Sequence, residues 1–392
     1  MRNCYDFDKT IYRKDSSIKF YFYCLKRRPT MIFGMFILAF YFLLNAIGMI
    51  TTKRLKEKFF GFLNKVKNID ELVEKFWAKE IKNVNAWYNE TKREDDVICS
   101  ASPQFLVEPA IKMINPNALV ICTQMDSTTG IITGENLKGV EKVNKLKEVL
   151  AEDVKFDSVY TDSISDLPIL DLAENKYIVC GKKYYKFGEQ KPTLGVKIKY
   201  VIKQMRVKHY VKNGLIFLPL FFSGLLTQWN SILSCVYGFI SFCLMASFVY
   251  VVNDLMDVKN DRKHTSKRKR PIACYMIKQH EAIIMAVVLF VSSVLINYFA
   301  FGLNPLIYVN LIGYAIINLL YSLWLKHIPI VDVFMLSACY LLRVFYGGLI
   351  IGTSVSKWLY LTILCGSLFM GFGKRRNEIK NEKEGTRKVS KH

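Results

Sequence analysis

Two groups of acidic residues, one in each half of the chain, stand where they could do chemistry. The first group comprises four carboxylates, one serine and two lysines, namely Asp6, Asp8, Ser100, Lys138, Lys142, Asp162 and Asp166. Crowded carboxylates repel one another, so we expect a cation beside them. Each short motif alone also fits a solvated turn, a helix cap or a wetted helix face. However, the motifs follow one another as Asp, Ser, Lys and Asp, and all of them fall at predicted strand ends or adjoining helix starts. This arrangement indicates a single site.

The second group follows a long apolar run and comprises Asn253, Asp254, Asp257 and Asp261. On a continuing helix these spacings place all four polar side chains on one face. Three carboxylates at a membrane boundary are costly unless a cation binds them. Oxygen ligands without neighbouring Cys or His favour a hard ion such as Mg²⁺, shared with substrate phosphates. The alternative is a solvated acidic loop.

A strongly basic stretch comes directly after these carboxylates, and its candidate binding residues are His264, Lys267, Arg268 and Arg270. On its own such a stretch is typical of a cytoplasmic loop of a membrane protein. Beside an acidic metal-binding face it also completes a diphosphate site, with Mg²⁺ on one side and Lys and Arg on the other.

Strand-like and helix-like segments alternate in the N-terminal half. Short β-rich runs occupy 3–8, 96–101, 118–125, 158–163 and 176–182, and helical segments include 103–115 and 139–151. This alternation predicts an α/β fold with a parallel sheet and helices on both faces. The carboxyl ends of such strands are where an open sheet builds its site, and the first group falls there.

A predicted helical insertion, roughly 12–95, separates the first two strands. Within it, residues 31–50 are apolar and long enough to be read as a transmembrane helix. A single crossing there would put Asp6 and Ser100 on opposite sides of the membrane. If those residues share a site, the segment must be a buried cap helix or one lying in the membrane interface. We expect a cap that touches the membrane.

The C-terminal half is dominated by apolar segments. Six stretches lie at 214–229, 231–252, 281–302, 304–325, 328–352 and 356–373, which predicts an all-α polytopic membrane bundle. The intervening loops alternate between basic and nearly neutral. By the positive-inside rule, the soluble half and the C-terminus are expected on the cytoplasmic side.

Composition supports a membrane partner and argues against nucleic acid. The chain has 55 basic and 33 acidic residues, a net charge of +22, yet 52% of it is apolar. That apolar content excludes a disordered tail protein and is unusual for a nucleic-acid binder. The ten cysteines are scattered, which indicates reduced thiols, and the polar start of the chain does not resemble a secretory signal.

The first group resembles the haloacid dehalogenase superfamily, in its phosphoserine-phosphatase-like branch with a helical cap. The resemblance covers about 1–190 and implies a Rossmann-like domain. It implies that Asp6 is the nucleophile and Asp8 the general acid and base. It also implies that Ser100 and Lys142, or Lys138, hold the phosphoryl oxygens, and that Asp6, Asp8, Asp162 and Asp166 hold Mg²⁺. The family usually has Gly or a small residue where this chain has Lys9.

The second group resembles the UbiA-type intramembrane transferases, in the branch that moves phosphoribose from phosphoribosyl diphosphate onto a polyprenyl phosphate. A linker at 191–205 would precede this domain at 206–392. Other matching motifs add the binding candidates Lys212, Asn213, Tyr321, Lys326, Asp332, Arg343, Lys374, Arg375 and Glu378. The family has nine transmembrane helices, so six predict an incomplete bundle.

Together these resemblances imply a Mg²⁺-dependent enzyme of a bacterial-type inner membrane, of unspecified oligomeric state. We expect its phosphatase to act on the product of its transferase. Two alternatives stay open. One is a prenyltransferase that uses a prenyl diphosphate and an aromatic acceptor. The other is a phosphatase held at the membrane by an inactive, truncated transferase half.

Overall fold

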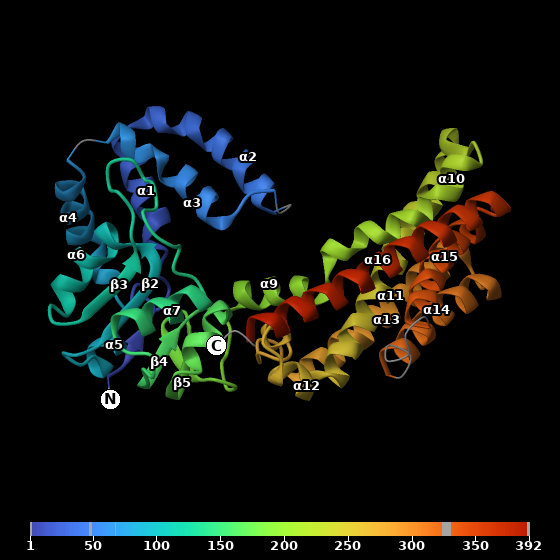
Figure 1. The fold of residues 1–392 in the computed structure, drawn as a ribbon. Coiled ribbons are helices and arrows are strands. Elements are labelled where there is room, and N and C mark those ends of the chain that lie inside the picture. Colours follow the sequence, from blue (N-terminus) through green and yellow to red (C-terminus); the bar gives the residue numbers. More distant parts are fainter. Residues whose placement is uncertain (1, 47–48, 67, 324–330, 390–392) are drawn as a thin grey trace. The chain divides into compact units, whose positions relative to one another are not determined.

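The computed structural model of the chain describes residues 2–46, 49–66, 68–323 and 331–389 (Figure 1). The chain divides into two units, Met1–Leu194 and Gly195–His392, each with its own core. The first is an α/β unit and the second is helical, so the predicted fold class is confirmed.

A six-stranded sheet organises the first unit. Its strands are β1 (Cys4–Tyr5), β2 (Val97–Pro103), β3 (Leu119–Thr123), β4 (Phe156–Thr161), β5 (Ala173–Cys180) and β6 (Lys183–Lys186). They lie in the order β3-β2-β1-β4-β5-β6, all parallel except the β5–β6 hairpin, which the sequence did not predict. Because β1 lies between β2 and β4, the carboxyl ends of these three strands meet.

Helices cover this sheet and form the cap. After the strands come α6 (Gln104–Ile114), α7 (Val140–Val149) and α8 (Leu167–Leu170), and the cap contains α1 (Ser16–Arg27), α2 (Gly34–Ala46), α3 (Thr52–Phe60), α4 (Ile69–Glu80) and α5 (Ala86–Thr91). The cap therefore occupies the predicted insertion.

Aromatic side chains join the cap to the sheet layer, and Trp77 is one of the most buried of them. Trp77 of α4 is fully buried, and its indole N–H donates to the Leu106 carbonyl at 2.7 Å. Its ring meets Phe7 and Tyr12 edge to face, with centroids 5.6 and 5.1 Å away. This packing fixes the cap over the ends of the strands.

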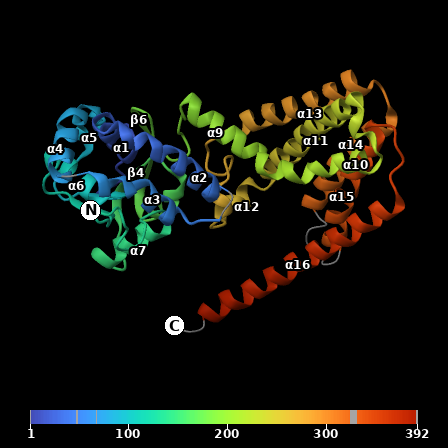
Figure 2. The same ribbon diagram turned by 90° about the horizontal axis from the view of Figure 1, so that it is seen from above.

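Within its described residues, the apolar segment at 31–50 contains no helix long enough to span a membrane. Its helix α2 has 13 residues, which gives roughly 20 Å of length, short of the ~30 Å of a bilayer core. Helices α2 and α3 pack side by side within the cap (Figures 1 and 2). Asp6 and Ser100 line one pocket, so no crossing separates them.

The second unit is a helical bundle. Its helices are α9 (Leu194–Met205), α10 (Leu218–Phe222), α11 (Trp229–Met256), α12 (Val258–Lys263), α13 (Gln279–Phe301), α14 (Pro305–Leu323), α15 (Val331–Ile350) and α16 (Lys357–Val389). Among the described residues, four helices are long and apolar enough to cross a membrane: α11, α13, α14 and the Val333–Ile350 part of α15. Figure 2 shows α11 and α13 side by side.

The predicted span at 214–229 is wrong. The chain there breaks into a 3₁₀ segment (Val207–Phe217), the short α10 and a second 3₁₀ turn (Leu225–Thr227). Pro219 begins α10, and Gly224 follows it with a left-handed φ of 73°. Proline removes a backbone donor and the left-handed residue ends the helix, so hydropathy alone misjudges the segment.

Polar side chains link three helices inside the bundle. The Ser241 hydroxyl of α11 donates to the Ser293 carbonyl of α13 at 2.9 Å. The Tyr346 hydroxyl of α15 donates to Asn297 Oδ1 of α13 at 2.6 Å. All four residues are fully buried, so these hydrogen bonds set how the helices align.

The loop between β3 and α7 generates a stability prediction. Gly130 has a left-handed φ of 73°, and a Cβ there would lie 2.5 Å from the Phe60 carbonyl oxygen. Gly130→Ala should therefore lower the free energy of unfolding of the first unit by about 2–4 kcal/mol, from backbone strain and the clash together.

Gly134→Ala is the matched control, because nothing lies within 4 Å of its added Cβ. Urea unfolding of the full chain in lipid nanodiscs, followed by pulse proteolysis, measures both variants. Equal midpoints for the two would contradict the packing of this loop on α3.

Candidate active sites

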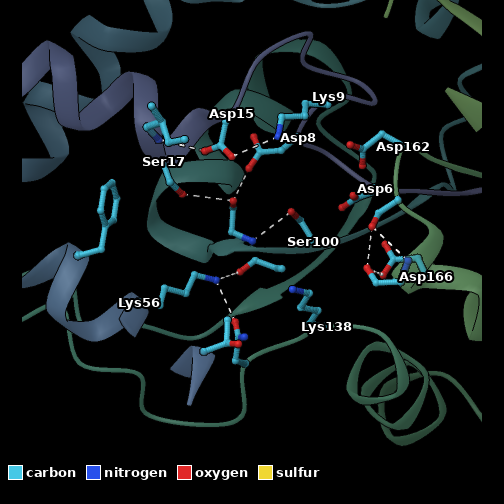
Figure 3. A pocket seen from close by; sticks show the side chains of 18 of the residues that line it. Asp6, Asp8, Lys9, Asp15, Ser17, Lys56, Ser100, Lys138, Asp162 and Asp166 are labelled. Carbon is cyan, nitrogen blue, oxygen red and sulfur yellow. Dashed lines mark hydrogen bonds and ion pairs between the residues drawn. The ribbon is translucent and has the colours of Figure 1, made fainter. Parts of the chain in front are cut away.

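A pocket in the first unit gathers the predicted catalytic residues (Figure 3). Its cavity of about 420 Å³ lies at the carboxyl ends of β1, β2 and β4, beneath α1, α2 and α3 of the cap. All seven predicted residues of this site line it: Asp6, Asp8, Ser100, Lys138, Lys142, Asp162 and Asp166. Strand β1 ends at Tyr5, so the first two carboxylates lie on the turn after the strand.

A buried ion-pair cluster closes the floor of the pocket. The Lys142 ammonium lies 2.9 Å from Asp6 Oδ1 and 2.7 Å from Asp166 Oδ2, and Lys142 is only 2% exposed. Burial disfavours the charged ammonium, but Asp6 and Asp166 outweigh it and raise the pKa of Lys142. Lys138 lines the same pocket, whereas the ion pairs belong to Lys142.

Asp8 is held in an orientation that faces the cavity. Its carboxylate accepts a 2.8 Å hydrogen bond from the Ser16 amide and another from the Ser102 hydroxyl. Burial, and then the negative charge of Asp15, raise the pKa of Asp8 to about 7. A carboxyl group with that pKa exchanges a proton readily near neutral pH.

Asp162 lies beside Asp6 in Figure 3. Burial, and then the charge of Asp6, raise the pKa of Asp162 to about 7, and burial likewise raises the pKa of Asp6. Among the described residues, no side chain or amide donates a hydrogen bond to the Asp162 carboxylate. Two repelling carboxylates, one without a donor, leave a place for a cation.

Several polar residues of the pocket were not predicted from the sequence, and two of them, Ser102 and Lys56, make clear contacts there. Ser102 follows Ser100 by two positions, and its amide donates to Ser100 Oγ at 3.2 Å. Lys56 comes from α3 of the cap, donates to the Ala101 carbonyl and to Asn136 Oδ1, and has its pKa lowered by burial to about 8. The Ser-Ala-Ser stretch could have signalled Ser102. Nothing near Lys56 in the sequence distinguishes it from other helix lysines.

The second site centres on Asp254, which is 2% exposed. Its carboxylate accepts hydrogen bonds from Gln204 Nε2 at 2.8 Å and Arg206 Nη2 at 2.7 Å. Arg270 Nη1 bridges Asp254 and Asp261, at 2.9 and 2.7 Å. The basic stretch thus folds back onto the acidic one. Gln204 and Arg206 were not among the predicted site residues.

The predicted continuous helix through these carboxylates is wrong. Helix α11 ends at Met256, Asp257 adopts φ −86° and ψ 1°, and α12 begins at Val258. Asp254 and Asp261 are brought together by Arg270 rather than by helical spacing alone. Asp261, which lies outside the membrane-spanning helices, has its pKa raised by burial, and Arg270 opposes that shift.

The remaining predicted ligands of the second unit are spread around the bundle. Lys212, His264 and Lys267 are exposed, Arg268 and Tyr321 are half-buried, and Asn213 and Arg343 are buried. Arg343 donates to Asn213 Oδ1 at 2.8 Å and to the Tyr314 hydroxyl at 3.1 Å. Lys326 lies outside the described residues, as do the side chains of Asp332, Lys374, Arg375 and Glu378.

Both sites offer oxygen donors of the kind that Mg²⁺ prefers. No group of three or more His, Cys, Asp and Glu is arranged as a metal site within the described ranges. The carboxylates are paired instead with Lys142 and Arg270. At the second site Asn253 Oδ1 is buried without a hydrogen-bond partner. At the first site the half-buried Asp162 carboxylate lies beside Asp6. These open oxygens fit a hard cation.

Comparisons with known proteins match the two units separately. Residues 4–171 match the haloacid dehalogenase-like hydrolases and residues 216–386 match the UbiA prenyltransferase family. The chain is 36% identical over 182 residues to the decaprenyl-phosphate phosphoribosyltransferase of Corynebacterium glutamicum, covering 46% of this chain and 54% of that protein. The enzyme of the same name from Mycobacterium tuberculosis is 38% identical over 183 residues, covering 46% of this chain and 60% of that protein.

A further relative extends across both units. The uncharacterized protein y4nM of Sinorhizobium fredii is 28% identical over 286 residues, which is 70% of this chain and 54% of that protein. The chain thus spans between half and two thirds of the length of these curated relatives. It carries a haloacid dehalogenase-like domain followed by a domain of the UbiA prenyltransferase family.

Proposed function

We propose that the chain is a two-part membrane enzyme of polyprenyl-phosphate sugar metabolism. The C-terminal unit transfers 5-phosphoribose from phosphoribosyl diphosphate to a polyprenyl phosphate, and the N-terminal unit is a Mg²⁺-dependent phosphomonoesterase. The observation that carries the phosphatase is the buried contact of Lys142 with Asp6 and Asp166 beside Asp8. The names of the mycobacterial and corynebacterial relatives support the transferase.

In the phosphatase reaction, an Asp6 oxygen attacks phosphorus and forms an aspartyl-phosphate while the phosphorus–oxygen bond to the leaving alcohol breaks. Asp8 donates its proton to that alcohol oxygen. Asp8 then removes a proton from water, whose oxygen attacks phosphorus and releases Asp6 and inorganic phosphate. Lys142 and Ser100 hold phosphoryl oxygens. Mg²⁺ on Asp6, Asp162 and Asp166 would neutralise phosphoryl charge.

In the transfer reaction, an oxygen of the lipid phosphate attacks the anomeric carbon of ribose as the bond to diphosphate breaks. Arg270, with the exposed cations of the same loop, neutralises the departing diphosphate. Asp254, Asp257 and Asp261 would hold Mg²⁺, which draws charge from that diphosphate. The product keeps a 5-phosphate, a phosphomonoester of the class that the first unit hydrolyses.

The proposed location is a bacterial-type inner membrane, with both sites on the cytoplasmic side where phosphoribosyl diphosphate is available. The basic loop that carries Lys267, Arg268 and Arg270 supports this orientation through the positive-inside rule. The match to prenyltransferases leaves a prenyl diphosphate as the competing donor. Transfer from geranyl diphosphate in preference to phosphoribosyl diphosphate would decide for it.

Separate variants should abolish the two activities independently. Asp6→Asn removes the nucleophile and should lower phosphate release by about a thousandfold or more, with transfer unchanged. Asp254→Ala should abolish transfer and leave phosphate release intact, because each site lies within its own unit. Assays on purified full chain in nanodiscs, with radiolabelled donor, measure both. No transfer by the wild-type chain would favour the membrane-held phosphatase.

The raised pKa of Asp8 generates a pH prediction. General-acid catalysis needs protonated Asp8, so kcat/KM for phosphate release should fall as the pH rises through about 7. Asp15→Asn removes a neighbouring negative charge while an amide oxygen still caps α1, so it should move this fall to lower pH. Lys19→Gln, an exposed change on the same helix, is the control. An unmoved profile in Asp15→Asn would contradict the assignment.

Arg270 should determine donor binding. Arg270→Ala should weaken phosphoribosyl diphosphate binding by about tenfold or more, because this guanidinium orders two carboxylates of the site and would also meet a donor phosphate. Arg270→Lys should recover only part of this, because an ammonium lacks the planar fork. Isothermal titration with Mg²⁺ present measures the affinity. Lys263→Ala, an exposed change on α12, should match the wild type.

A further inference from the structure

We infer that helix α2 of the cap inserts into the bilayer surface and presents to the first pocket a phosphomonoester carried by a membrane lipid. This inference rests on the phosphatase activity proposed above. It concerns a surface that the catalytic chemistry does not use.

The outer face of α2 is strongly apolar and exposed. Ile37, Phe40 and Leu43 are 62%, 58% and 59% exposed. No charged residue occurs anywhere in 29–50. A contiguous apolar patch of this kind is costly in water and marks a binding surface.

The opposite face of the helix belongs to the cap. Leu38 packs against the core of the first unit, and the Lys58 ammonium of α3 lies 5.7 Å from the centre of the Tyr41 ring. The helix is therefore fixed to the cap on one side and free on the other. With 13 residues the helix is too short to span a bilayer, so its length fits a position in the membrane interface.

Exposed cations lie on both sides of the apolar segment. Lys26, Arg27 and Arg28 precede it, and Arg54 and Lys58 follow it. Cations that flank an apolar helix complement the anionic surface of a bilayer, at about 1 kcal/mol for each near-surface charge. The first unit is joined through the chain to four helices that are long enough to cross a membrane, which keeps a bilayer at high local concentration. A bilayer is therefore the partner that the charges and the tether favour.

The same helix reaches the catalytic pocket. Phe42 lines the cavity together with Leu55, Phe59 and Phe60 of α3, and the catalytic carboxylates line the same cavity, which therefore has both an apolar and an acidic part to its wall. A ligand with a phosphomonoester at one end and an apolar chain at the other matches this division. Lys56 lines the same cavity, and its ammonium would meet a second anionic group on the lipid.

The test compares two double variants of the full chain in vesicles of phosphatidylcholine and phosphatidylglycerol. Phe40→Asp with Leu43→Asp changes the exposed face of α2 and no pocket residue. Ile131→Asp with Val149→Asp, at exposed apolar positions elsewhere in the unit, is the control. The substrates are p-nitrophenyl phosphate and a polyprenyl-phosphate-linked 5-phosphoribose embedded in the vesicles.

The α2 variant should lose about tenfold in kcat/KM for the lipid substrate and keep its activity on p-nitrophenyl phosphate. The control should keep both. Equal loss on both substrates, or no loss on either, would overturn the inference.

A second measurement does not depend on activity. Phe40→Trp should be quenched by brominated lipids above the wild-type background, and Val149→Trp should not. Equal quenching of the two overturns the membrane position of α2. If the wild-type chain hydrolyses neither substrate, the proposed phosphatase fails, and the quenching still decides where α2 lies.

Discussion

A buried ammonium between two carboxylates is the interaction on which the first unit depends. Lys142 from α7 contacts Asp6 after β1 and Asp166 after β4, so one side chain ties a helix to the ends of two strands. A charge in this position is stable only with both partners present, because burial removes its hydration. The catalytic carboxylates are thus also structural, because each of them balances the charge of the buried Lys142 ammonium.

In the second unit, buried carboxylates are paired with arginine rather than with lysine. Arg270 contacts Asp254 and Asp261, and Arg206 adds a second guanidinium to Asp254. Part of the large excess of basic residues in the sequence therefore serves to neutralise buried carboxylates. Guanidinium groups suit this task because their planar donors reach two oxygens at once. On donor binding, Mg²⁺ would take the place of Arg270 beside the carboxylates, and the diphosphate would take the place of the carboxylates beside Arg270.

Much of the fold follows from the sequence, and the failures have physical causes. Parallel strands such as β4 are buried on both faces, so their apolar runs are clear, and the site falls at their ends as predicted. The segment at 214–229 was misjudged because hydropathy does not register Pro219 or the left-handed Gly224. Lys56 was missed because only the folded cap brings α3 to the pocket. Lys9 adopts φ 57°, a left-handed conformation that favours Gly, which is the residue type that the family resemblance led us to expect there.

The hydrogen bonds that join Ser241, Ser293, Asn297 and Tyr346 have a mechanical consequence for the bundle. Apolar helices in hydrocarbon can slide past one another at little cost, since lipid tails and leucine side chains are interchangeable neighbours. A buried hydrogen bond removes that freedom, because a shift of one turn would leave its donor and acceptor unpaired. These four side chains therefore prevent the helices from shifting along one another. They hold α11 at one height, and with it the carboxylates at its end.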